Sequence, residues 1–336
     1  MQNKEILLEV KHLRTSFFTP EGEIKAVNDV SYHVNRQEVV AVVGESGCGK
    51  SITQMSVMQL VQSPPGKILS GEAVFEGEDI LKWDRNSKEM REFRGAKISM
   101  IFQEPMTSLN PVFTIGQQLV EVICLHKKVS KKDAWQVGID ALKDVGIPDA
   151  EARMKNYPFQ MSGGMRQRVL IAIAVACGSK MIIADEPTTA LDVTTQAQVM
   201  ELLKELVDKK GVSILMVTHN LGLVTRYADR VYVMYAGRIV ESGTTEDILM
   251  HPKHPYTEGL LKSVPRMDLS EEEDLVPIKG TPPLLAHLPD YCAFYPRCPY
   301  ASEQCRQDGI PELKCVGENE HFCACLRRES QVNGRE

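Results

Sequence analysis

The sequence lacks any long hydrophobic run. Its longest wholly apolar stretch, Val169 to Cys177, has nine residues, which is about half of what a membrane-spanning helix needs. It also lacks the apolar core of a signal peptide, because the segment Met1 to Glu5 leads directly into a short strand-like stretch. We therefore expect a cytosolic protein that reaches a membrane only through partner proteins.

The sequence also has no excess of positive charge. Its net charge is −6, with 43% hydrophobic and 25% charged residues, which is typical of an ordinary globular protein and does not favour general nucleic-acid binding. No internal repeat is visible. A length of 336 residues allows one large domain or two unequal ones.

A glycine-rich stretch, Gly44 to Ser51, stands between an apolar run and a helical pattern. It reads Gly-Glu-Ser-Gly-Cys-Gly-Lys-Ser, and the preceding residues, Val39 to Val43, suit a strand buried on both faces. This order predicts a P-loop, in which backbone N–H groups and the helix N-terminus bind phosphate oxygens. The nucleotide-binding residues predicted here are Gly44, Ser46, Gly47, Cys48, Gly49, Lys50 and Ser51. Lys50 is expected to reach the β- and γ-phosphates of ATP, and Ser51 is expected to bind Mg²⁺.

A second apolar run, Met181 to Ala184, ends in two carboxylates. Asp185 occupies the position of a Walker B aspartate that holds Mg²⁺ through its water shell. Glu186 is placed to polarise the water that attacks the γ-phosphate. Acidic residues often follow strands, so the assignment of Asp185 and Glu186 depends on the presence of the P-loop earlier in the chain.

The segment Ser162-Gly163-Gly164 opens a predicted helix shortly before these carboxylates. Two glycines at a helix N-terminus leave N–H groups exposed to an anion, although they are also compatible with a plain helix start. From Thr114 to about Arg153 the apolar spacing is that of helices, which predicts a helical subdomain, at about residues 104–178, within an α/β core.

Taken together, residues 5–262 resemble the ATP-binding subunit of ABC transporters. The resemblance implies that Ser162, Gly163 and Gly164 close over the γ-phosphate held by a partner's P-loop. It also assigns Gln103 as the Q-loop glutamine that reaches Mg²⁺ and His219 as the switch histidine. Asp192 matches the D-loop aspartate, and Phe17, with Phe18 as a near alternative, matches the aromatic ring that stacks on adenine. Catalysis would then rest on Glu186, His219, Gln103 and Lys50.

The signature differs from the family at one position. The family usually has Leu-Ser-Gly-Gly-Gln, whereas this chain has Met161-Ser162-Gly163-Gly164-Met165. The serine and both glycines are kept, so the difference puts the role of the fifth position in doubt rather than the activity.

Two further segments resemble the dipeptide/oligopeptide importer branch of the family. They are Phe102 to Pro111 and His254 to Thr257, and the stretch Tyr291 to Tyr300 extends the likeness, with tyrosine at position 291 where the branch typically has glycine. The expected architecture is an α/β P-loop ABC-type nucleotide-binding domain (5–262) with an inserted helical subdomain. A small Cys-rich C-terminal domain (263–336) would follow an acidic linker at Asp268 to Asp274.

Nine cysteines are spread unevenly, and six of them lie in the last 45 residues. In a reducing compartment this crowding favours a metal site over disulfides. The resemblance implies that Cys292, Cys298, Cys305 and Cys325 hold a [4Fe–4S] cluster, with Cys315 and Cys323 as extras. Four thiolates could equally bind Zn²⁺, and their wide spacings lack the tight pairs of most zinc ribbons.

The sequence and the resemblance together predict an ATPase that powers peptide import. The implied ligands are ATP, Mg²⁺ and a [4Fe–4S] cluster. The implied partners are a second related ATPase in a heterodimer (a homodimer in isolation is the alternative), two permease subunits and an external substrate-binding protein. The chain would lie peripherally at the cytoplasmic face of the membrane and bind no nucleic acid. Import of nickel or another small solute, or a soluble ABC-type ATPase acting on nucleic acid or ribosomes, are the alternatives.

Overall fold

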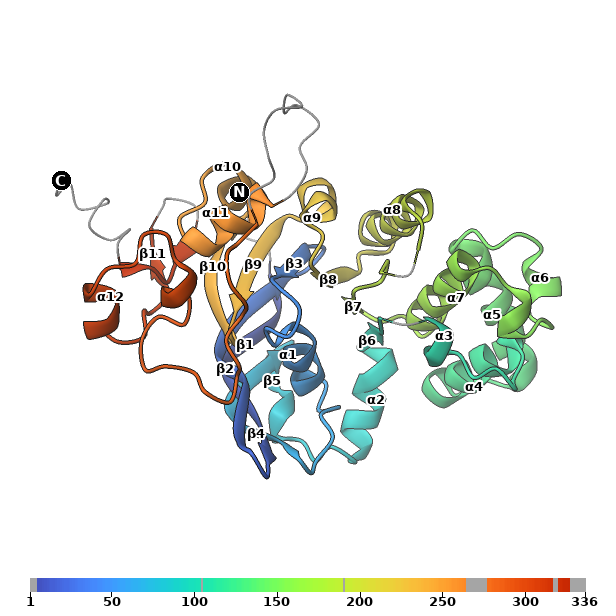
Figure 1. Cartoon of the computed structure of the whole chain (residues 1–336). Helices are drawn as coiled ribbons and strands as arrows, with labels where there is room; N and C mark the ends of the chain where they lie inside the picture. Colours follow the sequence, from blue (N-terminus) through green and yellow to red (C-terminus); the bar gives the residue numbers. More distant parts are fainter. Residues whose placement is uncertain (1–4, 104, 190, 264–276, 317–319, 327–336) are drawn as a thin grey trace. The chain divides into compact units, whose positions relative to one another are not determined.

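The computed structural model describes residues 5–103, 105–189, 191–263, 277–316 and 320–326 and divides them into two compact units. Unit 1 holds residues 35–39 and 83–217, and unit 2 holds the remaining described residues (Figure 1). The expected acidic linker at 268–274 lies outside the described residues.

Unit 2 is built mainly from strands. One antiparallel sheet has the order β2-β1-β4-β5, and a second set of neighbouring strands runs β11-β12-β10-β9-β3. Most residues of the following strands lie in this unit: β1 (Ile6–Thr19), β2 (Gly22–Asn35), β3 (Val39–Val43), β4 (Gly66–Phe75), β5 (Glu78–Asp79), β9 (Arg230–Tyr235), β10 (Arg238–Thr244), β11 (Lys314–Cys315) and β12 (Phe322–Cys323). All five residues of β3 are buried, as a wholly apolar, mostly β-branched strand requires.

Helix α1 (Lys50–Val57) follows β3 through the P-loop and is shorter than the apolar pattern predicts. The pattern continues to Val61, but Gln59 adopts a positive φ of 49°, which a right-handed helix does not allow. The side-chain amide nitrogen of Gln59 donates to the backbone carbonyl of Ile80 at 2.8 Å, so a tertiary contact stabilises the early end of the helix.

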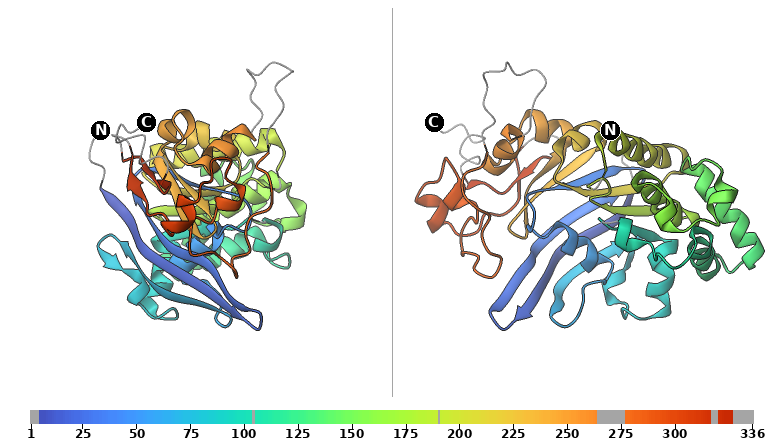
Figure 2. Two further views of the ribbon diagram at one scale, coloured as in Figure 1. Left: turned by 60° about the vertical axis from the view of Figure 1, so that its left-hand side comes forward. Right: turned by 45° about the vertical axis from the view of Figure 1, so that its right-hand side comes forward.

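The C-terminal segment of unit 2 joins the sheet of the same unit. Strand β12 pairs antiparallel with β10, and the two views of Figure 2 draw the red C-terminal segment beside the orange strands. His321 contacts the buried carboxylate of Glu241 in β10 at 2.8 Å. The helical elements of this unit are η1 (Ile80–Lys82), α9 (Leu221–Tyr227), α10 (Thr245–Met250), α11 (Pro255–Lys262), η3 (Tyr295–Arg297) and α12 (Gln304–Gln307).

Unit 1 combines a short parallel sheet with most of the long helices. Its strands β6 (Ile98–Ile101), β7 (Met181–Asp185) and β8 (Ser213–Thr218) pair in that order, and every residue of β7 is buried. Its helices are α2 (Lys88–Ala96), α3 (Pro105–Ser108), α4 (Ile115–Lys127), α5 (Lys131–Asp144), α6 (Ala150–Arg153), η2 (Pro158–Gln160), α7 (Gly163–Ala176) and α8 (Val193–Lys210).

Local sequence signals fix where these helices begin and end. Thr114 caps α4 in a capping box with Gln117, and Ser130 caps α5. Gly211 ends α8 with a φ of 69°, a left-handed conformation that glycine adopts without strain. Helices α4 to α7 pack on one another, in green in Figure 1, as expected of a helical subdomain.

The strands predicted from the apolar runs 39–43 and 181–184 are confirmed as β3 and β7, the second extended by one residue to Asp185. No helix in the described part of the chain is both long enough and apolar enough to cross a membrane.

Candidate functional site

The P-loop of unit 2 joins β3 to the first turn of α1. Ser46 and Gly47 are exposed at its tip, whereas Lys50 is only 5% exposed. The Lys50 ammonium group donates to the carbonyl oxygens of Gly44 at 2.7 Å and Glu45 at 2.9 Å. The lysine therefore lies along the loop whose N–H groups are expected to bind phosphate.

Two glycines of the loop are required by close approach of other strands. A Cβ atom on Gly49, whose φ is 103°, would lie 2.1 Å from the carbonyl oxygen of Ala26. A Cβ atom on Gly44 would lie 2.2 Å from the carbonyl oxygen of Met234. Since both obstacles are backbone atoms, neither position accepts a side chain without a shift of the main chain.

Cys48 lies on the inner side of the loop and is 5% exposed. Burial raises the pKa of its thiol above the ordinary value, so the neutral thiol predominates at neutral pH. The carbonyl of Cys48 accepts a hydrogen bond from the N–H of Gly237 at 2.9 Å. Ser51, the predicted Mg²⁺ ligand, follows Lys50 in the first turn of α1.

The predicted adenine-stacking residues and the switch histidine also lie in unit 2. Phe17 is half-buried on β1 opposite Gly66 of β4, and Phe18 is 51% exposed. Neighbouring strand residues point to opposite faces, so Phe18 presents the more accessible ring. His219 is exposed directly after β8 and precedes Asn220, which caps α9.

The predicted catalytic carboxylate of unit 1 is held in a defined position. Glu186 accepts hydrogen bonds at 2.8 Å from the Gln103 side-chain amide and at 2.8 Å from the Thr189 hydroxyl. Its φ of 46° is unusual for a glutamate and stores about 1–3 kcal/mol of backbone strain. Such strain is common at catalytic positions, because the surrounding structure must impose it. Asp185, the last residue of β7, is 6% exposed.

Helix α7 begins at the signature segment, with Ser162 as its N-cap. The Ser162 hydroxyl accepts a hydrogen bond from the N–H of Met165 at 3.3 Å, and both Ser162 and Gly163 are exposed. A Cβ atom on Gly164 would lie 2.6 Å from a methyl group of Thr195 in α8. The exposed turn can therefore present its N–H groups to an anion.

Asp192 caps the next helix, α8. Its carboxylate accepts from the backbone N–H of Thr195 at 2.9 Å and from the Thr195 hydroxyl at 2.7 Å. These hydrogen bonds hold the pKa of Asp192 below its usual value. The sequence predicted a functional D-loop residue here, and the structure gives the same side chain a capping role.

The four cysteines predicted as cluster ligands line a single pocket in unit 2. Its walls also include His254, Phe294, Tyr295, Tyr300 and Pro311. Burial and the neighbouring Cys325, Cys298 and Cys305 raise the pKa of the Cys292 thiol to about 11. Cys315 is exposed and Cys323 is buried in β12; neither lines this pocket. Among the residues that the structure describes, no group of three or more His, Cys, Asp or Glu side chains has the arrangement of a metal-ion site.

Sequence reasoning missed three residues around the P-loop. The carboxylate of Glu45 forms an ion pair with Arg297, and the Glu45 N–H donates to the hydroxyl of Tyr256. Glu45 stands at a variable position of the G-x-x-x-x-G-K-S motif, but a carboxylate in a phosphate-binding loop is itself a signal that a counter-charge is needed.

Comparison with known families accounts for most of the chain. The model described as "ABC transporter" matches residues 27–189, and the model described as "Oligopeptide/dipeptide transporter, C-terminal region" matches residues 240–305. The first match contains the P-loop, the signature and Glu186; the second contains Tyr256, Arg297 and three of the four pocket cysteines.

Curated relatives align over nearly the whole sequence. The dipeptide transport ATP-binding protein DppD of Bacillus subtilis is 52% identical over 98% of this chain and 96% of its own. The oligopeptide transport ATP-binding protein AppD of the same organism is 53% identical over 89% of this chain and 90% of its own. The probable D,D-dipeptide transport ATP-binding protein DdpD of Escherichia coli is 46% identical over 97% and 98%, respectively.

Solved structures show the same fold. A dimeric post-hydrolysis state of the ATP-binding cassette MJ0796, bound to ADP and phosphate, matches 71% of this chain and 98% of its own with a TM-score of 0.63 and 26% identity. The cbiO1 protein of Clostridium perfringens, part of an ABC transporter complex, matches 74% and 92% with a TM-score of 0.62 and 26% identity. The chain therefore belongs to the family of ABC transporter ATP-binding proteins that carry the oligopeptide/dipeptide transporter C-terminal region.

Proposed function

We propose that this chain is the ATP-hydrolysing subunit of an importer that takes up dipeptides or oligopeptides. One observation carries the proposal: the chain combines an ABC ATPase region with the peptide-transporter C-terminal region, and relatives named for peptide transport align with both. As such a subunit, the chain would lie at the cytoplasmic face of the membrane and dock onto two permease subunits that an external binding protein supplies with peptide.

The proposed nucleotide site uses the P-loop to bind the triphosphate. Backbone N–H groups of the loop and the start of α1 would surround the phosphate oxygens, and Lys50 would exchange its bonds to loop carbonyls for bonds to phosphate. Ser51, Gln103 and Asp185 each carry an oxygen of a type that Mg²⁺ prefers, namely a hydroxyl, an amide carbonyl and a carboxylate, respectively. The cation would neutralise charge on the phosphoryl oxygens.

The proposed hydrolytic step depends on Glu186 as the base that orients and polarises the attacking water. Gln103 and Thr189 both donate to the same carboxylate oxygen of Glu186, and these two hydrogen bonds fix the orientation of the carboxylate. His219 would contact the γ-phosphate, and Asp192 would stand at the boundary with the partner ATPase. We infer that Ser162, Gly163 and Gly164 complete the site of a second, related ATPase in a heterodimer, because their turn is exposed and has the geometry of an anion site.

For the C-terminal cysteines we propose a [4Fe–4S] cluster with a structural role. Cys292, Cys298, Cys305 and Cys325 line one pocket, as four ligands of one cluster must. Four thiolates can also bind a single Zn²⁺ ion, so the iron and zinc contents of the protein distinguish the two metals.

The cluster is tested by anaerobic purification. The protein should be brown and contain iron and acid-labile sulfide in equal amounts, and Cys298→Ser should lose the colour. Cys315→Ser is the matched control, because Cys315 lies outside the pocket and its replacement should leave the iron content unchanged. A colourless protein with stoichiometric zinc, or with no metal, would exclude the cluster.

The transport proposal is tested by uptake of labelled peptides in cells that lack this chain. Complementation with the wild-type chain should restore uptake of dipeptides or of longer peptides, and the Lys50→Ala variant should not. Normal peptide uptake without the chain, together with a loss of nickel or another small solute, would assign a different substrate.

A further inference from the structure

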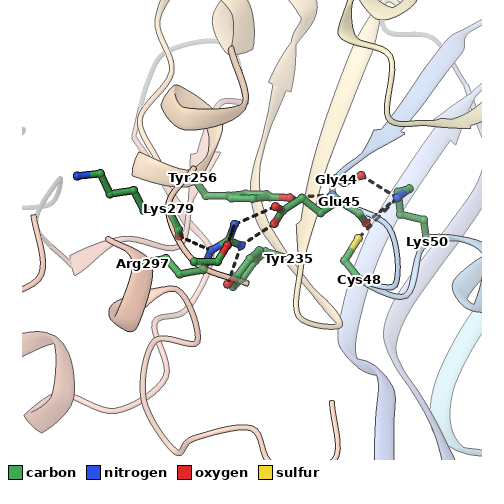
Figure 3. Close-up of polar contacts among 9 residues, drawn as sticks. Gly44, Glu45, Cys48, Lys50, Tyr235, Tyr256, Lys279 and Arg297 are labelled. Carbon is green, nitrogen blue, oxygen red and sulfur yellow. Dashed lines mark hydrogen bonds and ion pairs between the residues drawn. The ribbon is translucent and has the colours of Figure 1, made fainter. Parts of the chain in front are cut away.

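Glu45, inside the phosphate-binding loop, is held from three sides (Figure 3). Its carboxylate accepts two hydrogen bonds from the Arg297 guanidinium, at 2.6 and 2.9 Å. Its backbone N–H donates to the hydroxyl of Tyr256 at 2.8 Å, and its carbonyl accepts from Lys50. Two of these three contacts come from residues within 240–305, the match to the oligopeptide/dipeptide transporter C-terminal region.

The Arg297 side chain is also held by residues outside the P-loop. Its side chain is 5% exposed, and its remaining donors are directed to the carbonyl of Lys279 at 3.0 Å and the hydroxyl of Tyr235 at 3.3 Å. The guanidinium lies 5.9 Å from the ring centroid of Phe294. A planar group with this many fixed partners holds the Glu45 carboxylate in one orientation.

The rings beneath the ion pair are tightly packed. Tyr235 and Tyr256 have centroids 4.6 Å apart, and Phe294 stands edge-on to Tyr235 at 5.3 Å. Tyr256 and Phe294 are both almost fully buried. Arg297 therefore rests on a rigid base, and little side-chain entropy remains to be lost when it binds Glu45.

The charge of Glu45 conflicts with the function of the loop. A carboxylate beside a bound triphosphate repels it, and the repulsion is strong where protein has replaced water. The side chain of Glu45 is 26% exposed, so it is only partly screened. Arg297 neutralises this carboxylate and draws it toward the C-terminal region.

We propose that Arg297 is a positioning residue of the nucleotide site, which neutralises Glu45 and thereby keeps the P-loop able to bind the triphosphate. The inference rests on the proposed ATP-binding function of the same loop. It gives the C-terminal region a function in nucleotide binding, whether or not that region holds a cluster.

The test is a double-mutant cycle on the purified full chain, with the magnesium complex of the non-hydrolysable analogue AMP-PNP as the probe. Arg297→Met should raise the Kd about tenfold, which corresponds to the loss of one charge-assisted interaction near the ligand. Adding Glu45→Gln should bring the Kd back to within about threefold of wild type, because the unneutralised charge is then gone. A merely structural role would predict the opposite, an additional loss.

Arg306→Met is the matched control. Arg306 belongs to the same C-terminal region and lies over the Tyr291 ring at 5.5 Å, and its removal should leave the Kd unchanged. If Arg297→Met fails to fold in a thermal melt, Arg297→Lys takes its place: it keeps the charge but loses the two-pronged contact, and its Kd should rise about threefold.

An unchanged Kd in the Arg297 variant that folds, or a double variant weaker than Arg297→Met, would overturn the inference. If the wild-type chain itself does not bind the analogue, the proposed function fails instead, so the two failures are distinguishable.

Discussion

The P-loop of unit 2 and the signature turn of unit 1 are both glycine-bearing helix starts, but they are held in different ways. Gly49 precedes α1 without any side-chain cap, and the loop depends on contacts with Ala26, Met234, Gly237, Tyr256 and Arg297 from elsewhere in the unit. Helix α7 instead begins with a local cap, the Ser162 hydroxyl.

This difference indicates which kind of contact each of the two segments needs for its proposed function. The P-loop is preorganised by tertiary structure, as expected for the segment that we propose binds the triphosphate. The signature turn is exposed and is capped locally by Ser162, as expected for a segment that we propose meets a partner's nucleotide. Changes in the packing around the P-loop should therefore impair binding, and changes in the signature should impair hydrolysis alone.

The largest effect on nucleotide binding is expected for Lys50→Ala. It removes the bonds to Gly44 and Glu45 and the charge expected to contact phosphate, so the Kd for ATP should rise about 100-fold. Equilibrium titration with labelled ATP measures it, and Lys25→Ala is the control on another lysine of the same unit. ATP binding at wild-type strength would place the triphosphate elsewhere.

Gly49→Ala should come next. Its Cβ would meet the Ala26 carbonyl at 2.1 Å, so the variant should lose about 2 kcal/mol of stability or more. Gly47→Ala is the matched variant: no atom lies within 4 Å of its Cβ, and only its φ of 78° opposes the change, at about 1 kcal/mol. Denaturant unfolding of both compares them directly. Equal losses would contradict the view that tertiary contacts shape the loop.

In the signature, Ser162→Ala combined with Gly164→Asp should leave the ATP affinity of the isolated chain largely unchanged. Hydrolysis by the assembled pair should fall about tenfold or more, because the signature turn loses the Ser162 hydroxyl and gains a negative charge beside the N–H groups proposed to bind the partner's γ-phosphate. Steady-state phosphate release by the reconstituted pair measures the effect. Undiminished hydrolysis would show that the chains do not share sites.

The smallest effect concerns thiol reactivity in the P-loop. Because burial raises the pKa of Cys48, alkylation by iodoacetamide at pH 7.5 should be much slower at Cys48 than at the exposed Cys315. The rate at Cys48 should increase as the pH rises through and beyond the ordinary thiol range, since only the thiolate reacts. Peptide mass mapping over time measures both sites, and comparable rates at pH 7.5 would mean that the loop opens readily.

The sequence predicted the parts that depend on local spacing. The P-loop, the strand that ends at Asp185 and the helix start at Ser162 all follow from residues within one short window, so period and motif are enough to find them. The family resemblance added Gln103, and the structure places its side chain on Glu186.

The contacts that join distant segments could not be predicted. Glu45 and Arg297 are 252 positions apart, and Glu241 and His321 are 80 apart, so no spacing rule connects them. The early end of α1 has the same origin, because Gln59 is fixed by a carbonyl 21 residues away. Tertiary packing decides these features, and a single sequence does not show which side chains will meet.

The most direct test of the account separates binding from hydrolysis in one variant, Glu186→Gln. The account predicts that this variant, assembled with its partner and incubated with ATP, binds ATP as tightly as wild type. Its hydrolysis should fall about 100-fold or more, the usual loss for a general base. The nucleotide recovered from it should therefore be ATP, whereas the wild-type pair yields ADP. Recovery of ADP from the Glu186→Gln pair at the wild-type rate, or failure of the variant to bind ATP, would contradict the division of functions between the two units.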